Sequence, residues 1–169
     1  PVLSRGLGDV YKRQCYNRSK LLQLICRDKF TIVVSGSHGK TSTTSFLGHL
    51  LVCAGLNPTV ISGGVMQNFG QNIYLTNSKY VVVEADESDG TVFQLSPRYL
   101  LYLNVDREHI DFYKSYSNFK SKIKKYILSQ NKKDCKIFIN NDDFFLSSLK
   151  KYSGNIKTFG SNSDANYSY

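Results

Sequence analysis

The sequence has little of what marks several other protein classes. Its 169 residues include no tryptophan, three prolines and four cysteines. No apolar run is long enough to span a membrane, and the N-terminal stretch lacks the apolar segment of a secretory signal. The cysteines, Cys15, Cys26, Cys53 and Cys135, form no C-x-x-C pair, which argues against a zinc site or a disulfide framework. We therefore expect one cytoplasmic domain with a sizeable core and no membrane partner.

Acidic residues are also scarce. There are 13 acidic residues against 22 basic ones, so the net charge is +9, an excess that can indicate nucleic-acid binding. Much of the excess lies in residues 120–133, around the apolar residues Tyr116, Phe119, Ile123 and Ile127. Their helical spacing is typical of an amphipathic helix with a solvated basic face. No nucleic-acid-binding motif accompanies it, and we expect no nucleic-acid partner.

A glycine-containing turn between an expected strand and an expected helix is the most informative stretch. Residues 31–34 are apolar or β-branched, which predicts a buried strand. Gly36 and Gly39 then allow the backbone to approach a ligand closely. The helix that follows is predicted from Phe46, Leu47, Leu50, Leu51 and Ala54, with Gly55 at its end. This order points backbone N–H groups and the positive end of the helix dipole at one spot.

The same turn supplies groups suited to the phosphates of a nucleoside triphosphate. The run from Gly36 to Ser42, G-S-H-G-K-T-S, is shorter than the common phosphate loop G-x-x-x-x-G-K-[ST], because Val34 stands at its first glycine position. Lys40 adds a cation, and Thr41 adds a hydroxyl suited to Mg²⁺. A plain turn with a chance Gly-Lys-Thr is the alternative, but the register of these residues with the helix start favours phosphate binding.

Two further stretches place reactive side chains after expected strands. The apolar run 80–83 ends in Glu84, which places a carboxylate at the carboxyl end of an expected parallel strand. In open α/β sheets, ligands bind outside these carboxyl ends. Mg²⁺ beside phosphates takes one or two protein carboxylates, and Glu84 is the best candidate. His109 follows the strand predicted over 99–105 and has acidic neighbours that can orient an imidazole, so we interpret it as functional. Asp86, Glu87 and Asp89 are either supporting groups or a solvated turn.

Strands and helices are expected to alternate along the whole chain. Further strands are predicted over 58–61, 136–140 and 155–159, and further helices over 116–130 and 143–151. This alternation indicates βαβ units and an α/β fold with a mostly parallel, doubly wound sheet.

Three remaining segments show weaker patterns. Residues 62–72 are rich in glycine and amides, which suits either a plain turn or a loop that binds a polar substrate. Residues 1–14 resemble a translated sequencing adapter, so we expect a non-native or disordered lead-in there. Residues 161–169 are expected to end without completing an element.

Three motifs together resemble the central ATP-binding domain of the Mur ligases. They are the turn 36–42, the run E-A-D-E-S-D-G over 84–90, and the pattern N-x-D-x-x-H-x-D over 104–111. The resemblance covers residues 15–169 and implies part of the central domain of a three-domain protein. His38 and the acidic run are most similar to the branch that joins L-alanine to UDP-N-acetylmuramate.

The resemblance implies an ATP- and Mg²⁺-dependent amide ligase of peptidoglycan synthesis. ATP would convert the carboxylate of UDP-N-acetylmuramate to an acyl phosphate, which the amino group of L-alanine would attack. The implied phosphate-binding residues are Gly36, Ser37, His38, Gly39, Lys40, Thr41 and Ser42. Lys40, Glu84 and His109 are implied catalytic residues, and Thr41, Glu84 and His109 are implied metal ligands. Asn72 and Asn104 are weaker candidates for substrate contacts.

Two alternatives stay open at this point. Another Mur-type ligase, such as one that reattaches recycled tripeptide to the same sugar nucleotide, would share the phosphate loop, but there we expect tyrosine in place of Ser88. A non-ligating P-loop NTPase or a basic nucleic-acid-binding module belongs to a different class. Nucleic-acid binding would show a steep dependence on salt concentration.

Overall fold

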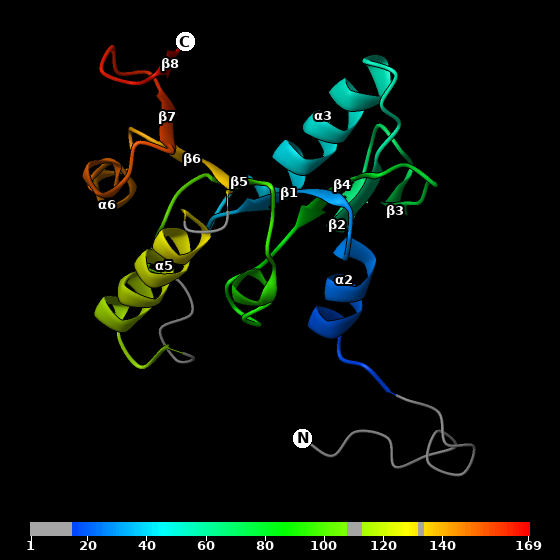
Figure 1. Cartoon of the computed structure of the whole chain (residues 1–169), viewed down its shortest axis with the longest axis horizontal. Helices are drawn as coiled ribbons and strands as arrows, with labels where there is room; N and C mark the ends of the chain where they lie inside the picture. Colours follow the sequence, from blue (N-terminus) through cyan, green and yellow to red (C-terminus); the bar gives the residue numbers. More distant parts are fainter. Residues whose placement is uncertain (1–14, 108–112, 132–133) are drawn as a thin grey trace.

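A computed structural model describes residues 15–107, 113–131 and 134–169 (Figure 1). Within these ranges eight strands form one sheet in the order β3-β2-β4-β1-β5-β6-β7-β8. Their bounds are β1 Phe30–Ser35, β2 Thr59–Met66, β3 Gln71–Tyr74, β4 Tyr80–Glu84, β5 Tyr99–Tyr102, β6 Lys136–Asn140, β7 Ile156–Gly160 and β8 Tyr167–Ser168. All neighbours are parallel except the antiparallel pair of β2 and β3. The predicted mostly parallel α/β sheet is confirmed.

Helices lie on both faces of the sheet. The α-helices are α2 Arg18–Cys26, α3 Lys40–Cys53, α5 Tyr116–Asn131 and α6 Phe144–Ser147, and the 3₁₀ helices are η1 Val92–Gln94 and η2 Lys150–Tyr152. Figure 1 shows α3 on one face and α2 and α5 on the opposite face, as a doubly wound sheet requires. No helix in the described part of the chain is long and apolar enough to cross a membrane. All four cysteines, which lie within the described ranges, are free.

The order of strands changes direction at β1. Val33 of β1 pairs with Val83 of β4 on one side and with Leu100 of β5 on the other. From β1 the chain passes through α3 to β2 on the β4 side, whereas β5 continues the sheet on the other side. In open α/β sheets, ligands bind at the carboxyl ends of the strands where the order changes in this way. The glycine turn after β1 lies at this point.

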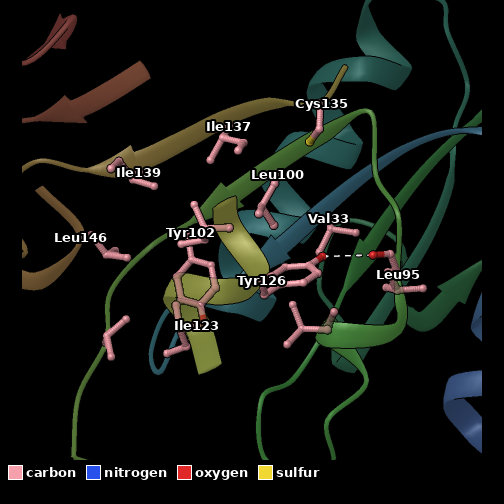
Figure 2. Packing of buried hydrophobic residues seen from close by; sticks show 14 of the residues in the cluster. Val33, Leu95, Leu100, Tyr102, Ile123, Tyr126, Cys135, Ile137, Ile139 and Leu146 are labelled. Carbon is pink, nitrogen blue, oxygen red and sulfur yellow. Dashed lines mark hydrogen bonds between the residues drawn. The ribbon is translucent and has the colours of Figure 1, made fainter. Parts of the chain in front are cut away.

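The larger hydrophobic core lies between α5 and the sheet (Figure 2). Phe119, Ile123 and Ile127 are buried, as their helical spacing predicts. They pack in one cluster with apolar side chains of β1, β4, β5 and β6. The Tyr126 hydroxyl donates a hydrogen bond to the Leu95 carbonyl at 3.3 Å, which satisfies a polar group that would otherwise be buried unpaired.

Helix α3 packs through only part of the predicted face. Leu47 and Leu51 pack against the cluster formed by β1, β2 and β4, whereas Phe46 and Leu50 are 61% and 48% exposed. The buried residues of the helix are Thr44 and Gly48. Gly48 is buried because α3 lies close to β2, since a Cβ added at Gly48 would lie 2.7 Å from Cγ2 of Val60. Hydrophobic periodicity cannot identify a contact that depends on a missing side chain.

Because α3 lies so close to β2, a larger residue at Gly48 is expected to destabilise the fold. Gly48→Ala is expected to lower the free energy of unfolding by about 1–2 kcal/mol, because the buried, β-branched Val60 cannot move aside. This net loss is an overpacking cost of about 2–3 kcal/mol less the gain of about 1 kcal/mol from the higher helix propensity of alanine. Urea unfolding measures it, and Gly154→Ala is the control, since nothing lies within 4 Å of that added Cβ. An unchanged midpoint for Gly48→Ala would contradict this packing.

The predicted loop over 62–72 is wrong in part. Strand β2 continues to Met66, and β3 returns antiparallel to it, with Ile61 paired to Ile73. Gly70 lies in the turn between β2 and β3. Gly63 and Gly64 are residues of β2, and a Cβ at Gly63 would lie 3.2 Å from Glu84 Oε1, so glycine permits the close approach there. What looked like a turn therefore forms one wall of the site described below.

Two predictions near the C-terminus also need correction. The helix predicted over 143–151 is divided into α6 and η2, because the hydroxyls of Ser147 and Ser148 bond to carbonyls three residues earlier and compete with the helical pattern. Residues 161–169 do contain an element, the short strand β8. It is held beside β7 by reciprocal hydrogen bonds between Thr158 and Asn166 at 2.9 and 3.0 Å.

Candidate nucleotide-binding site

The turn after β1 borders a cavity of about 420 Å³. The cavity is lined by Ser37, His38, Gly39, Lys40, Thr41, Ser42, Glu84 and Asp86. Gly36, behind it, has φ of 139°, and a Cβ there would lie 3.0 Å from the Asn104 nitrogen. Gly39 has φ of 80° and directly precedes the first residue of α3. Both glycines are therefore required by the backbone, and the amino end of α3 lies at the cavity, where its dipole favours an anion.

The chain after β5 holds the turn in place. Asn104 Oδ1 accepts a hydrogen bond from the His38 N–H at 2.8 Å, and its Nδ2 donates to the His38 carbonyl at 3.1 Å. The Ser37 N–H donates to the Asn104 carbonyl at 3.1 Å, and Ser37 Oγ accepts from the Asp106 N–H at 2.9 Å. Asn104, which we predicted as a substrate contact, thus has both polar ends of its side chain bonded to the turn.

The loop histidine has an acidic neighbour at the mouth of the cavity. His38 Nε2 lies 3.3 Å from Asp106 Oδ2, and both side chains are more than half exposed. The Arg107 N–H and then the His38 imidazole lower the pKa of the Asp106 carboxyl, because both groups bond to its charged form. This pair gives the loop a second attachment to the segment after β5.

Glu84 ends β4 and joins it to both the turn and β2. Its Oε2 accepts hydrogen bonds from Thr41 Oγ1 at 3.0 Å, from Ser62 Oγ at 2.5 Å and from the Gly63 N–H at 2.9 Å. The residue is only 7% exposed. Ser62 and Gly63 are site residues that the sequence reasoning missed. Their only sign in the sequence is the glycine- and amide-rich stretch 62–72, which suits either a plain turn or a loop that binds a polar substrate.

The pair of Thr41 and Glu84 suits a magnesium ion. A hydroxyl and a carboxylate are ligands of the kind that Mg²⁺ prefers, and Mg²⁺ beside phosphates keeps most of its waters. Across the described ranges, no group of three or more His, Cys, Asp or Glu residues forms a closed metal site. An open, partly hydrated ion is therefore the kind that this donor set fits. His109, predicted to hold a second ion, lies outside the described residues.

Lys40 is folded back over the turn. Its Nζ donates hydrogen bonds to the Gly36 carbonyl at 2.6 Å and to the Ser37 carbonyl at 3.1 Å. Carboxylate oxygens of Asp86 and Glu87 lie 3.9 and 3.8 Å away, and the lysine side chain is 10% exposed. A cation is thus held at the wall of the cavity, within reach of an anion that enters it.

The acidic run after β4 is not a uniform solvated turn. Asp86 is partly exposed and accepts a hydrogen bond from the Ser88 N–H at 2.9 Å. Asp89 forms an ion pair with Arg18 of α2 at 3.1 Å. Glu87 turns inward and is 1% exposed. The three carboxylates therefore have different surroundings, which their spacing in the sequence does not reveal.

A second cavity adjoins the first. It has a volume of about 600 Å³, lies between α2 and the β2–β3 hairpin, and is also lined by Glu84 and Asp86. Asn72, the other predicted substrate contact, lies on β3 in its wall, and Arg18 lies on α2 in the opposite wall. Glu84 and Asp86 thus stand between two cavities.

Fold and site together define an α/β domain with a glycine turn of the phosphate-binding type after the central strand β1. Residues 34–169 match the Mur ligase middle domain family. The chain therefore belongs to the Mur ligase family, as its three motifs predict.

Within the Mur ligase family, the chain is similar to ligases that carry the same name in different bacteria. The UDP-N-acetylmuramate–L-alanine ligase of Hydrogenobaculum sp. (strain Y04AAS1) is 44% identical over 114 residues, which cover 68% of this chain and 25% of that protein. The ligase of the same name from Aquifex aeolicus (strain VF5) is 40% identical over 149 residues, or 88% of this chain and 33% of that protein. The chain thus spans about a quarter to a third of the length of these curated relatives.

Solved structures agree on the fold. The UDP-N-acetylmuramate–alanine ligase MurC of Thermotoga maritima superposes with a TM-score of 0.74 at 27% identity, over 91% of this chain and 34% of that chain. The MurF ligase of the same organism, solved in complex with ADP, gives a TM-score of 0.62 at 21% identity, over 95% and 38% of the two chains. The second similarity concerns the fold alone.

Proposed function

We propose that residues 15–169 are part of the central domain of an ATP-dependent ligase that joins L-alanine to UDP-N-acetylmuramate. The observation that carries this proposal is the meeting of two cavities at Glu84, one lined by the phosphate-type turn and one by Asn72. Such a ligase must bring the γ-phosphate of ATP beside the carboxylate of the acceptor. The two relatives of that name, 44% and 40% identical, support this choice of substrates.

The reaction needs an acyl phosphate because a free carboxylate has no good leaving group. ATP phosphorylates the acceptor carboxylate, and the amino group of L-alanine then displaces phosphate to form the amide. Lys40 and the N–H groups of the turn bind the β- and γ-phosphates and stabilise the charge on them during transfer. Thr41 and Glu84 hold Mg²⁺, which when bound neutralises phosphate charge. His109 is proposed as the ligand of a second Mg²⁺.

The remaining site residues have supporting parts in this proposal. The turn residues Gly36, Ser37, His38, Gly39 and Ser42 surround the phosphates together with Lys40 and Thr41. Asn104 positions the turn through the His38 backbone, whereas Asn72 contacts the acceptor substrate from the second cavity. This changes the expected part of Asn104 from contacting substrate to shaping the phosphate site.

Nucleotide titrations test the phosphate site. The chain is titrated calorimetrically with ATP, ADP and AMP in the presence of Mg²⁺. Because the turn binds β- and γ-phosphates, ATP and ADP should bind, and AMP should bind at least about tenfold more weakly. Asp164→Asn, which removes an exposed charge far along the chain from the turn, is the control and should bind like the wild type. Equal affinities for the three nucleotides would contradict the phosphate site.

A chimera tests the ligase reaction. Residues 15–169 replace the matching segment of the Aquifex aeolicus ligase, and ATP-dependent phosphate release is measured with UDP-N-acetylmuramate and L-alanine. Release should require both substrates. Release with free tripeptide in place of L-alanine would favour another Mur-type ligase, and ATP hydrolysis that is independent of both would favour a non-ligating NTPase.

A further inference from the structure

A buried acid that the proposed reaction does not use lies beneath the phosphate-binding turn. Glu87 Oε1 lies 3.1 Å from Ser35 Oγ on β1. The same hydroxyl lies 2.8 Å from the Ala85 carbonyl, and one proton cannot serve both acceptors at once. Among the residues that the structure describes, no donor meets hydrogen-bond geometry at Glu87 Oε2. The groups that act on this carboxyl are the hydroxyl of Tyr102, which carries no charge, and the ammonium of Lys40, which is 3.8 Å from Oε2.

The backbone of Glu87 is held in place by two hydrogen bonds to its carbonyl oxygen. The Gly90 N–H donates to the Glu87 carbonyl at 3.1 Å, and the Tyr113 hydroxyl donates to the same carbonyl. Burial raises the pKa of the Glu87 carboxyl, while the hydroxyl of Tyr102 and the ammonium of Lys40 act to lower it. A carboxylate that is 1% exposed is costly unless a cation compensates it.

We propose that Glu87 is a positioning residue for Lys40, the buried counter-charge that holds the lysine ammonium at the turn before a nucleotide binds. This inference rests on the proposed nucleotide site. When bound phosphates draw the Lys40 ammonium away, the buried Glu87 carboxylate loses part of the positive charge that compensates it. Glu87 therefore keeps the cation in position and also lowers the affinity of the site for nucleoside di- and triphosphates.

The pairing is tested without any nucleotide, by thermal unfolding of Lys40→Met in the wild-type and Glu87→Gln backgrounds. In the wild type, Lys40→Met should lower Tm by about 3–6 °C, because an uncompensated buried carboxylate remains. In the Glu87→Gln background the shift should be below about 1 °C. An equal loss in both backgrounds would overturn the pairing. If Glu87→Gln does not fold, Glu87→Met, which keeps the volume and removes the charge, takes its place.

A matched control comes from Asp86. Its Oδ2 lies 3.9 Å from the same ammonium, but its side chain is 33% exposed, against 2% for Glu87. Water screens such a pair, so the shift caused by Lys40→Met should be nearly unchanged in the Asp86→Asn background. Coupling as large for Asp86 as for Glu87 would assign the role to the whole acidic run and overturn the specific proposal.

Nucleotide affinity gives the second readout. Glu87→Gln should bind Mg·ATP about three- to tenfold more tightly than the wild type, because the ammonium no longer has to leave a buried charge. A role only in supporting the fold would instead weaken binding. If the wild type binds ATP and Glu87→Gln binds it no more tightly, the proposal fails. If the wild type binds no nucleotide, the proposed function fails, while the unfolding cycle still decides whether Glu87 and Lys40 form a pair.

Discussion

Lys40→Ala is expected to weaken the binding of Mg·ATP by about a hundredfold, which corresponds to about 2.8 kcal/mol. The ammonium is the cation that the turn holds at the cavity, and its Nζ already bonds to two carbonyls of that turn. Removing one partner of a desolvated charge pair commonly costs 2–5 kcal/mol. Calorimetric titration with Mg·ATP measures the change.

The matched control for Lys40→Ala is Lys125→Ala, which removes the same charge from the exposed face of α5. Its affinity for Mg·ATP should stay within about twofold of the wild type, because salt screens a distant surface charge. AMP, which lacks the β- and γ-phosphates, should show no difference between Lys40→Ala and the wild type. An affinity of Lys40→Ala for Mg·ATP within threefold of the wild type would remove the turn from the nucleotide site.

The central part of the fold was predictable because its pattern is local. A β-branched run, two glycines and a helix start follow one another within 31–44, and each has a backbone reason to be there. The same holds for α5, whose buried stripe of Phe119, Ile123 and Ile127 repeats at helical spacing. Long-range pairing is different. That β2 lies beside β4, which brings Ser62 to Glu84, follows from tertiary packing and has no local pattern.

The polar residues of the site show a similar division. The motifs indicated which strand ends carry them, because polar residues interrupt apolar runs there. They did not indicate the partner of each side chain. Asn104 bonds to the backbone of His38, and Glu87 turns inward while Asp86, next to it, stays partly exposed. Such choices depend on distances of a few ångströms between segments far apart in the sequence. His109 stays a prediction.

Glu84→Gln is expected to remove most of the Mg²⁺ dependence of ATP binding. The amide keeps the size of the side chain, and its carbonyl oxygen can still accept hydrogen bonds from Thr41, Ser62 and Gly63, so the fold should persist. The negative charge that attracts the cation is lost. The Kd of ATP is measured in Mg²⁺ and in EDTA. In the wild type, Mg²⁺ should lower Kd about tenfold or more, and in Glu84→Gln less than about twofold.

The metal-free measurement should move in the opposite direction. Without Mg²⁺, the Glu84 carboxylate repels the triphosphate, so ATP in EDTA should bind Glu84→Gln a few-fold more tightly than the wild type. Damage to the fold would weaken binding in both conditions, which separates the two explanations. Asp86→Asn also removes a charge from the cavity wall, but the hydroxyl of Thr41 bonds to Glu84, so this control should keep its Mg²⁺ dependence. Full Mg²⁺ dependence in Glu84→Gln would leave Glu84 only the structural part of joining β4 to β2.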